Sequence, residues 1–501
     1  MKKLLLLMAL MGCLISAQAQ KESDAMKYAE TITKEDMYDH LSILASDALE
    51  GRETGERGQK MAAAFISDHF KRLGLTAPVD GGYLQPVELY TSLPGNSYVT
   101  AKDQKFENFN EIVYFGSMVT DGDIEQEIVF VGNGTPEEFD KVDVKGKAVL
   151  AMVDNYRKFR GIVSTAKEKG AVISLVVPTS TDEEFAGVRD LFKNFLKGGR
   201  LSLQKPKDNT TDPGLFFVAP SVATTIFKAE IEKLNKAMEQ GSLKKIKKGS
   251  FSYHTEREVK TVDSENVLGY LEGTDLKEEL VVLTAHYDHI GRNGEEINNG
   301  ADDDGSGTSA IMEMAEAFVK AKKEGKGPRR SILFMTVTGE EKGLLGSSYY
   351  AANPVFPLEN TIVDLNIDMI GRIDEEHADD PNYVYLVGSD RLSTELHEIS
   401  EKVNETYTEF NLDYTYNAES HPDRIYYRSD HWSFAKNNVP VIFYFNGVHE
   451  DYHKPTDTID KIEFDLLTRR TKLVFHTAWV LANRDTRPTV DKIQDTKLDK
   501  N

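Results

Sequence analysis

The stretch Val281–Phe318, VVLTAHYDHIGRNGEEINNGADDDGSGTSAIMEMAEAF, decides the fold and the chemistry of this chain. It begins as an apolar run and passes His286, Asp288 and the aspartates at 302–304. It ends in an apolar segment with helical spacing. Imidazole and clustered carboxylate groups together are typical ligands of zinc and related metal ions. The stretch therefore predicts a metal site between a strand and a helix.

The same alternation of strand and helix continues from Glu265 to Arg484. Apolar runs predict strands at Leu280–Thr284, Ser331–Val337, Thr361–Ile367, Tyr383–Val387 and Val439–Phe445. Helical stretches are predicted at Ser309–Lys323, Arg391–Tyr407 and Asp430–Lys436. This order favours an α/β fold in which helices sandwich a mixed, largely parallel sheet. Ligands of such sheets bind beyond the carboxyl ends of the strands.

His286 stands where its ring can project from the end of a strand. A lone histidine is more often structural, but Asp288 follows two residues later. A carboxylate that accepts the second N–H of a ligand imidazole fixes the tautomer and orientation of the ring. The spacing leaves open whether His289 is the ligand instead.

Asp302, Asp303 and Asp304 precede a glycine-rich turn and a helix. Aspartate at a helix start is often only a cap. Three adjacent carboxylates repel one another, however, and would be costly to bury without a cation. Next to a histidine they favour a metal site, most simply with one carboxylate bridging two cations.

Glu340 and Glu341 follow the predicted strand Ser331–Val337. Adjacent side chains of an extended segment point to opposite sides. One glutamate can therefore bind a metal while the other faces the substrate as a general base. A solvated acidic turn is the alternative.

Asp368 lies at another predicted strand end, where a carboxylate between Ile367 and Met369 needs a partner. His453 follows the last strand, and Asp457 is expected to support the site from outside the ligand set. The pair at 430–431 is expected to have a substrate-side or packing role.

Composition and missing motifs exclude other classes. The 501 residues suggest two to three domains, and the net charge of -22 argues against nucleic acid and against anionic membranes. Cys13 is the only cysteine, and it lies in the N-terminal segment that is expected to be cleaved. Cleavage would leave the mature chain with no thiolate ligand, and a cysteine nucleophile is excluded. The sequence has no G-x-S-x-G elbow and no H-E-x-x-H helix.

Residues 1–19 resemble a secretory signal peptide, with a basic start, a short apolar run and the cleavage pattern Ala17-Gln18-Ala19. A secreted or periplasmic protein is therefore expected. Lipidation of Cys13 is the less favoured alternative. No other segment approaches transmembrane length.

Five motifs occur in order: AHYDH, GADDDGSG, GEEKGLLGS, NIDMIGR and DYHKPTDT. Together they resemble the co-catalytic di-zinc aminopeptidase family of secreted bacterial leucine aminopeptidases and glutamate carboxypeptidase. The resemblance covers Glu35–Leu75 and Glu265–Arg484 and implies the zinc-peptidase fold.

The resemblance also implies roles for individual residues. Two Zn²⁺ ions would share Asp303, with His286 and Asp368 on one ion and Glu341 and His453 on the other. Glu340 would be the general base toward a metal-bridging hydroxide, Asp288 would support His286, Tyr452 would help stabilise the oxyanion, and the Asp303–Asp304 peptide would be cis.

The implied activity is hydrolysis of peptides, most simply by an aminopeptidase. A carboxypeptidase or dipeptidase of the same family, a glutaminyl cyclase and a non-catalytic peptide-binding protein remain alternatives. The filled ligand positions and the intact Glu340 count against the non-catalytic alternative.

Residues 101–250 differ in character from their flanks. VDVKGKAVLA followed by AKEKGAVISLVV resembles the β-rich protease-associated domain inserted in many members, which would restrict access or bind substrate. The predicted organisation is a signal peptide at 1–19, a catalytic domain at 20–100 and 251–487, an insertion at 101–250 and a polar tail at 488–501.

Overall fold

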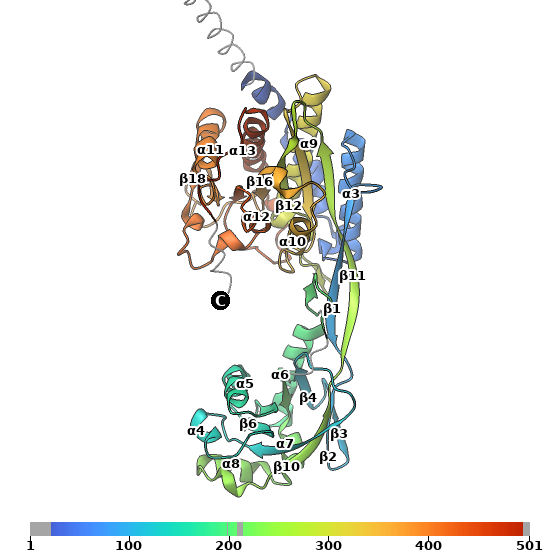
Figure 1. Ribbon diagram of the computed structural model, residues 1–501, viewed down its shortest axis with the longest axis vertical. Coiled ribbons are helices and arrows are strands. Elements are labelled where there is room, and N and C mark those ends of the chain that lie inside the picture. Colours follow the sequence, from blue (N-terminus) through green and yellow to red (C-terminus); the bar gives the residue numbers. More distant parts are fainter. Residues whose placement is uncertain (1–21, 198, 208–213, 494–501) are drawn as a thin grey trace, which may run out of the picture. The chain divides into compact units, whose positions relative to one another are not determined.

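The computed structural model describes residues 22–197, 199–207 and 214–493, and the chain divides into two compact units (Figure 1). The second unit is Leu89–Val262, and the first comprises the segments on either side of it. The predicted signal peptide at 1–19 lies outside the described residues, as do residues 494–501 of the predicted tail. Among the described residues, no helix combines the length and the apolar character needed to cross a membrane.

The predicted domain boundaries, after residues 100 and 250, differ from the division of the structure. They would cut strands β2 (Tyr98–Ala101) and β10 (Gly249–His254). These strands pair with each other, and β10 also pairs with β5 (Ile124–Phe130). Because strands group with their hydrogen-bonded partners, the second unit extends beyond the predicted insertion at both ends.

The sheet of the first unit has the strand order β18-β17-β19-β16-β12-β15-β11-β1. The bounds are β18 (Asn411–Asp413), β17 (Tyr383–Val387), β19 (Val441–Phe445), β16 (Thr361–Ile367), β12 (Leu276–His286), β15 (Arg330–Val337), β11 (Arg257–Leu271) and β1 (Leu84–Pro94). The four strands β19, β16, β12 and β15 are parallel neighbours. On one side of these four strands β17 pairs antiparallel with β19, and on the other side β11 pairs antiparallel with β15. The predicted mixed sheet is confirmed, with its parallel part in the middle.

Alternation along the strands explains why helices cover both faces of this sheet. Val281 and Leu283 of β12 join one hydrophobic cluster, whereas Leu280 and Val282 join another. The first cluster contains residues of α2 (Lys34–Leu44), α3 (Arg57–Leu73), α9 (Gly307–Lys323), α11 (Thr394–Tyr407) and α13 (Phe464–Asn483). The second contains residues of α10 (Leu345–Ala352) and α12 (His431–Ala435). The predicted helical sandwich is confirmed.

The segment Glu35–Leu75, which the family resemblance covers, is divided between the helices α2 and α3. A short helical turn, Asp47–Arg52, separates α2 from α3. Gly51 has φ +69°, and a Cβ there would lie 2.4 Å from the carbonyl oxygen of Gly291. The close approach of two backbones therefore requires glycine, and it brings Arg52 beside the metal centre described below.

The second unit has its own sheet and its own hydrophobic core. The strand order is β3-β2-β10-β5-β6-β7-β9-β4. The remaining bounds are β3 (Gln104–Glu107), β4 (Ile112–Phe115), β6 (Ala148–Met152), β7 (Ile173–Val177), β9 (Leu215–Val218), α4 (Pro136–Phe139), α5 (Phe159–Glu168), α6 (Asp182–Lys197), α7 (Pro220–Phe227) and α8 (Ile231–Glu239). A short strand, β8 (Leu201–Ser202), pairs with Tyr90 and Thr91 of β1.

Candidate metal centre

The strand ends bring the predicted ligands together. His286 is the last residue of β12, and Glu341 follows β15. Asp368 follows β16, and His453 lies in the loop after β19. Because these four strands are parallel neighbours, their carboxyl ends meet at one edge of the sheet.

Asp303 lies at the centre of this cluster. Its Oδ1 atom is 3.2 Å from Nε2 of His286, which is itself 3.5 Å from Oδ1 of Asp368. Its Oδ2 atom is 3.1 Å from Nε2 of His453. The two carboxylate oxygens thus face two different groups of ligands, as a carboxylate bridging two cations requires. The Asp303–Asp304 peptide is cis, as the family resemblance implied.

Glu341 completes the second group together with an additional histidine. Its Oε2 atom is 3.1 Å from Nε2 of His453, and its Oε1 atom is 2.9 Å from Nδ1 of His289. His289 is fully buried, and its Nδ1 atom lies 3.7 Å from Oδ2 of Asp303. His289 therefore does not replace His286 but joins the other group.

The unsatisfied polar atoms of this cluster fit a bound metal ion. Oδ2 of Asp303, Oε1 of Glu341 and both ring nitrogens of His289 are buried without a hydrogen bond among the described residues. Such atoms are rare in folded proteins unless they bind something. Burial opposes ionisation of Asp303, but the surrounding histidines hold its pKa well below the usual range. The ligands are anionic carboxylates and imidazoles, a donor set that suits zinc.

The three adjacent aspartates have different partners. Oδ1 of Asp304 accepts hydrogen bonds from the backbone N–H groups of Met369 (3.0 Å) and Gly307 (2.9 Å), the latter as a helix cap would. Oδ1 of Asp302 accepts from the N–H of Gly371 (2.6 Å). Asp302 and Asp304 therefore hold backbone N–H groups, and Oδ2 of Asp302 also lies 3.2 Å from Nε2 of His449. Of the three aspartates, Asp303 is the one that approaches the histidines of both ligand groups.

Two supporting carboxylates act through the backbone. The Asp457 carboxylate accepts from the N–H groups of Asp302 and Asp303 at 3.1–3.2 Å, so its predicted support of the site is confirmed. The prediction for Asp288 was wrong in its detail. Nδ1 of His286 lies 3.0 Å from the backbone carbonyl oxygen of Asp288 and 3.8 Å from its carboxylate.

The Asp288 carboxylate has other partners. It accepts from the hydroxyl of Thr54 (2.7 Å) and from the backbone N–H of Glu340 (3.2 Å). Asp288 therefore orients the ring of His286 through its carbonyl group and holds the Glu340 loop through its side chain.

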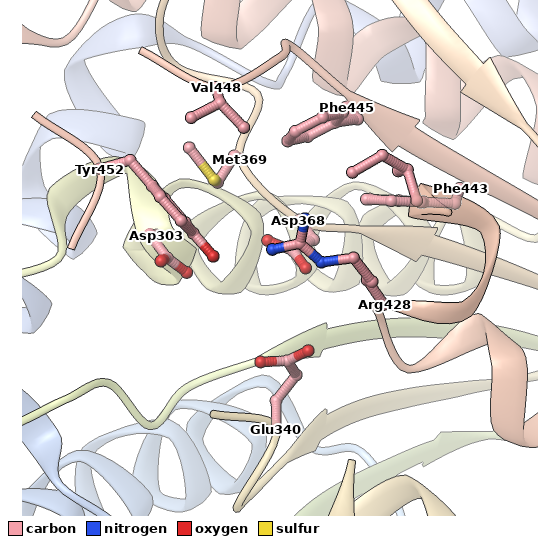
Figure 2. A pocket seen from close by; sticks show the side chains of 10 residues that line it. Asp303, Glu340, Asp368, Met369, Arg428, Phe443, Phe445, Val448 and Tyr452 are labelled. Carbon is pink, nitrogen blue, oxygen red and sulfur yellow. The ribbon is translucent and has the colours of Figure 1, made fainter. Parts of the chain in front are cut away.

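A pocket opens beside the cluster (Figure 2). Its lining comprises Asp303, Glu340, Asp368, Met369, Ile425, Arg428, Phe443, Phe445, Val448 and Tyr452. Glu340 faces the pocket while Glu341 faces the histidines, as predicted from their adjacency. Burial and the nearby carboxylates Asp368 and Glu341 raise the pKa of Glu340 well above its usual range, although His286 opposes this shift. Burial and nearby carboxylates also raise the pKa of Tyr452.

Sequence comparison assigns this region to a family. Peptidase family M28 matches residues 266–478, which contain all the ligands above. Residues 266–478 form an M28 peptidase domain. The chain is 27% identical over 239 residues to Aminopeptidase YwaD of Bacillus subtilis, covering 46% of this chain and 48% of that protein. It is 32% identical over 213 residues to a probable leucine aminopeptidase of Arthroderma otae, covering 41% and 55%. The chain spans about half the length of these curated relatives.

Solved structures share the fold of the chain beyond the M28 domain. An aminopeptidase from Aneurinibacillus sp. strain AM-1 aligns with a TM-score of 0.54 and 20% identity, covering 94% of this chain and 98% of that one. BSAP, a zinc aminopeptidase from Bacillus subtilis, gives a TM-score of 0.50 and 19% identity, covering 93% and 99%. At such low identity these alignments support the fold alone.

Several residues that brace the M28 domain were not predicted from the sequence. Buried Arg52 donates to the carbonyl oxygens of Tyr287 (2.8 Å) and Gly300 (2.9 Å), which lie at the two ends of the loop that contains His289. The Ser429 hydroxyl donates to Oδ2 of Asp368 at 2.7 Å. The motif containing Asp430 and His431, singled out in the sequence, begins directly after Ser429.

The pair at 430–431 has a packing environment. The ring of His431 stacks on Phe443 with centroids 4.8 Å apart, and burial lowers its pKa to about 3. His431 Nε2 lies 2.8 Å from the carbonyl oxygen of Tyr426. Asp430 is fully buried, and burial raises its pKa to about 7. Neither residue lines the pocket, which agrees with the packing alternative.

Proposed function

We propose that this protein is a zinc-dependent exopeptidase, most simply an aminopeptidase that releases N-terminal residues from peptides. The observation that carries the proposal is Asp303, whose two oxygens face two ligand groups beside a pocket that contains Glu340. The M28 match and the aminopeptidase names of the relatives support peptides as substrates.

Two zinc ions are proposed as the cofactor. His286, Asp303 and Asp368 would hold one, and Asp303, Glu341 and His453 the other, with His289 beside the second. When bound, zinc polarises the scissile carbonyl group and lowers the pKa of water. The buried polar atoms without hydrogen bonds support this assignment.

Glu340 is the proposed general base. Glu340 lines the pocket and is not needed as a ligand. Its pKa is raised above that of an ordinary glutamate, and a general base works best when its pKa lies near the pH of the reaction. Its carboxylate takes a proton from the attacking water and passes it to the leaving amine. Asp288 positions it through the backbone N–H of Glu340.

Tyr452 is the proposed donor to the carbonyl oxygen as negative charge develops there. Its raised pKa keeps the phenol protonated, so that it can donate. Figure 2 shows Tyr452 close to Asp303, with Glu340 across the pocket. Glu340 would thus transfer the proton from one side of the pocket, and Tyr452 would stabilise the developing negative charge from the other.

Arg428 supports a second candidate function, that of a carboxypeptidase or dipeptidase with the same hydrolytic chemistry. It is the one basic residue among the ten that line the pocket, where apolar side chains such as Phe443 and Phe445 also lie. A guanidinium group is suited to bind a free carboxylate. A carboxypeptidase or dipeptidase would use it for the C-terminus of the substrate, whereas an aminopeptidase would bind an apolar first residue in the same pocket.

The location and the second unit belong to the same proposal. Residues 1–19 would direct the chain to the periplasm or the exterior, with lipidation of Cys13 as the alternative. The second unit would be a protease-associated domain, supported by the sequence similarity at 142–177.

The test is hydrolysis of a panel of aminoacyl anilides beside N-blocked peptides and C-terminal reporter peptides. Each is measured with chelator and after zinc is added back. Chelator-sensitive release from free N-termini is the expected result. Cleavage of the C-terminal reporters alone would move the assignment to a carboxypeptidase, and silence on all substrates by zinc-loaded protein would contradict hydrolysis.

A further inference from the structure

A second group of histidines and carboxylates lies among the helices of the first unit. His40 comes from α2, His69 from α3, and Glu313 and Glu316 from α9. We call these four residues the helical cluster. Glu313 and Glu316 lie beyond the first turn of α9, about 9–14 Å along its axis from Gly307.

The distances within the helical cluster resemble those of the metal centre. Nε2 of His40 is 3.0 Å from Oε1 of Glu313 and 3.6 Å from Oε1 of Glu316. Nε2 of His69 is also 3.6 Å from Oε1 of Glu316. The nitrogen–oxygen distances at the metal centre span 2.9–3.7 Å for the same kinds of atoms. One ion can be reached by an atom of His40, His69 and Glu316 together, because these atoms lie within 4.8 Å of one another.

Burial makes this cluster costly without a cation. The Glu313 side chain is only 1% exposed and that of His69 only 5%. Nε2 of His40 and Oε1 of Glu313 are buried without a hydrogen bond among the described residues. A carboxylate in such surroundings needs a compensating positive charge.

Two sources of that charge compete. Burial lowers the pKa of His40, but the carboxylates of Glu313 and Glu316 nearby outweigh this effect and raise the pKa to about 9. A protonated His40 would then pair with Glu313, while Nε2 of His69 stays near the carbonyl oxygen of Met312 at 3.3 Å. This pair leaves two carboxylates to share one imidazolium, whereas a divalent ion would balance both.

We propose that His40, His69, Glu313 and Glu316 bind a divalent transition-metal ion of the zinc class in a structural site. Two imidazoles and two carboxylates supply the four ligands of a closed tetrahedral site. Such an ion would tie α2 and α3 to α9, the helix that directly follows the Asp303 loop. The proposal does not depend on peptide hydrolysis.

The test is zinc content per chain, measured by elemental analysis of full-length protein stripped with chelator, reloaded and freed of excess zinc. The parent is Asp303→Ala, which removes the bridging ligand of the metal centre. Adding Glu313→Gln and Glu316→Gln is expected to remove one further equivalent of zinc. Adding His476→Asn instead is the control, since that histidine is buried against Tyr407 outside the cluster; it is expected to remove none.

Equal zinc content with and without the two glutamates would overturn the proposal in favour of the ion pair. If the combined variant does not fold, Glu316→Gln alone serves, because that side chain is 43% exposed. It is expected to weaken zinc binding at this site by at least about tenfold in competition with a chromophoric chelator. Unchanged binding curves would again overturn the proposal.

Discussion

The metal centre and the helical cluster use the same residue types at similar spacing, yet their surroundings differ. The metal centre lies where parallel strands end, beside a pocket lined by Glu340, Arg428 and Tyr452. The helical cluster lies between three helices, and each of its carboxylates already faces a histidine. The difference shows that ligands alone do not make an active site. A carboxylate outside the ligand set and a space for substrate are also needed.

Asp303→Ala should have the largest effect, and it should affect the metal centre but not the helical cluster. Because this carboxylate faces both ligand groups, its loss should release metal from both and reduce peptide hydrolysis to background. Zinc content and hydrolysis are measured on the same sample. The helical cluster should keep its ion, so a variant that retains full activity would refute the bridging role.

Glu340→Gln should separate chemistry from metal binding. Loss of a general base typically costs about 10²–10⁴-fold in rate, and zinc content should not change, because Glu340 is not needed as a ligand. A steady-state kcat near that of the wild type would disprove the base assignment.

The pH profile sharpens the same point. Glu340 must be ionised to act as a base, and its pKa is raised in the fold. The wild-type kcat/KM should therefore fall as pH decreases through the pKa of Glu340, and this limb should vanish in Glu340→Gln.

Zinc should stabilise the helical cluster independently of catalysis. An ion at a hundred times its dissociation constant stabilises the folded state by about 2.7 kcal/mol. With zinc at that concentration, thermal unfolding of the Asp303→Ala protein should show a free energy of unfolding higher by this amount. Adding Glu313→Gln and Glu316→Gln to the same protein should abolish the increase. An identical zinc-dependent shift in both proteins would place the stabilising ion elsewhere.

His289→Ser should give the smallest effect. The buried ring approaches Glu341 at 2.9 Å and Asp303 at 3.7 Å, so its loss should weaken zinc at the second ligand group by about 10–100-fold. Zinc affinity by chelator competition measures this, with His476→Asn again as control. Equal affinity in His289→Ser and wild type would remove His289 from the ligand group.

The sequence predicted the ligands better than their supports. His286 and Asp368 could be found because they stand at the ends of apolar strands, and Asp303 because three adjacent aspartates precede a glycine-rich turn and a helix. Both are local signals. The opposite facing of Glu340 and Glu341 also followed from their adjacency. Support from backbone groups has no such signal, so the contact of His286 with the Asp288 carbonyl rather than its carboxylate required the structure.

Long-range contacts explain most of what was missed. Thr54 and Arg52 reach the metal centre from a segment more than 200 residues earlier in the chain, and no spacing rule connects them. His40 and His69 lie in amphipathic helices where a single histidine carries little information. The domain boundaries were displaced because β2 and β10 pair with each other across more than 140 residues of sequence, a pairing that no local pattern reveals.

The division of the first unit into two segments has a consequence for how the chain folds as it is synthesised. Arg52, from the earlier segment, donates to the carbonyl oxygen of Gly300, from the later one. The second unit lies between them, is continuous in sequence and has its own core, so it can fold while the later strands are still being made. Once folded, it replaces a long flexible loop and lowers the entropy cost of joining the two segments. His453 is the last of the proposed ligands to be synthesised, so the metal centre is incomplete until about nine-tenths of the chain has been made.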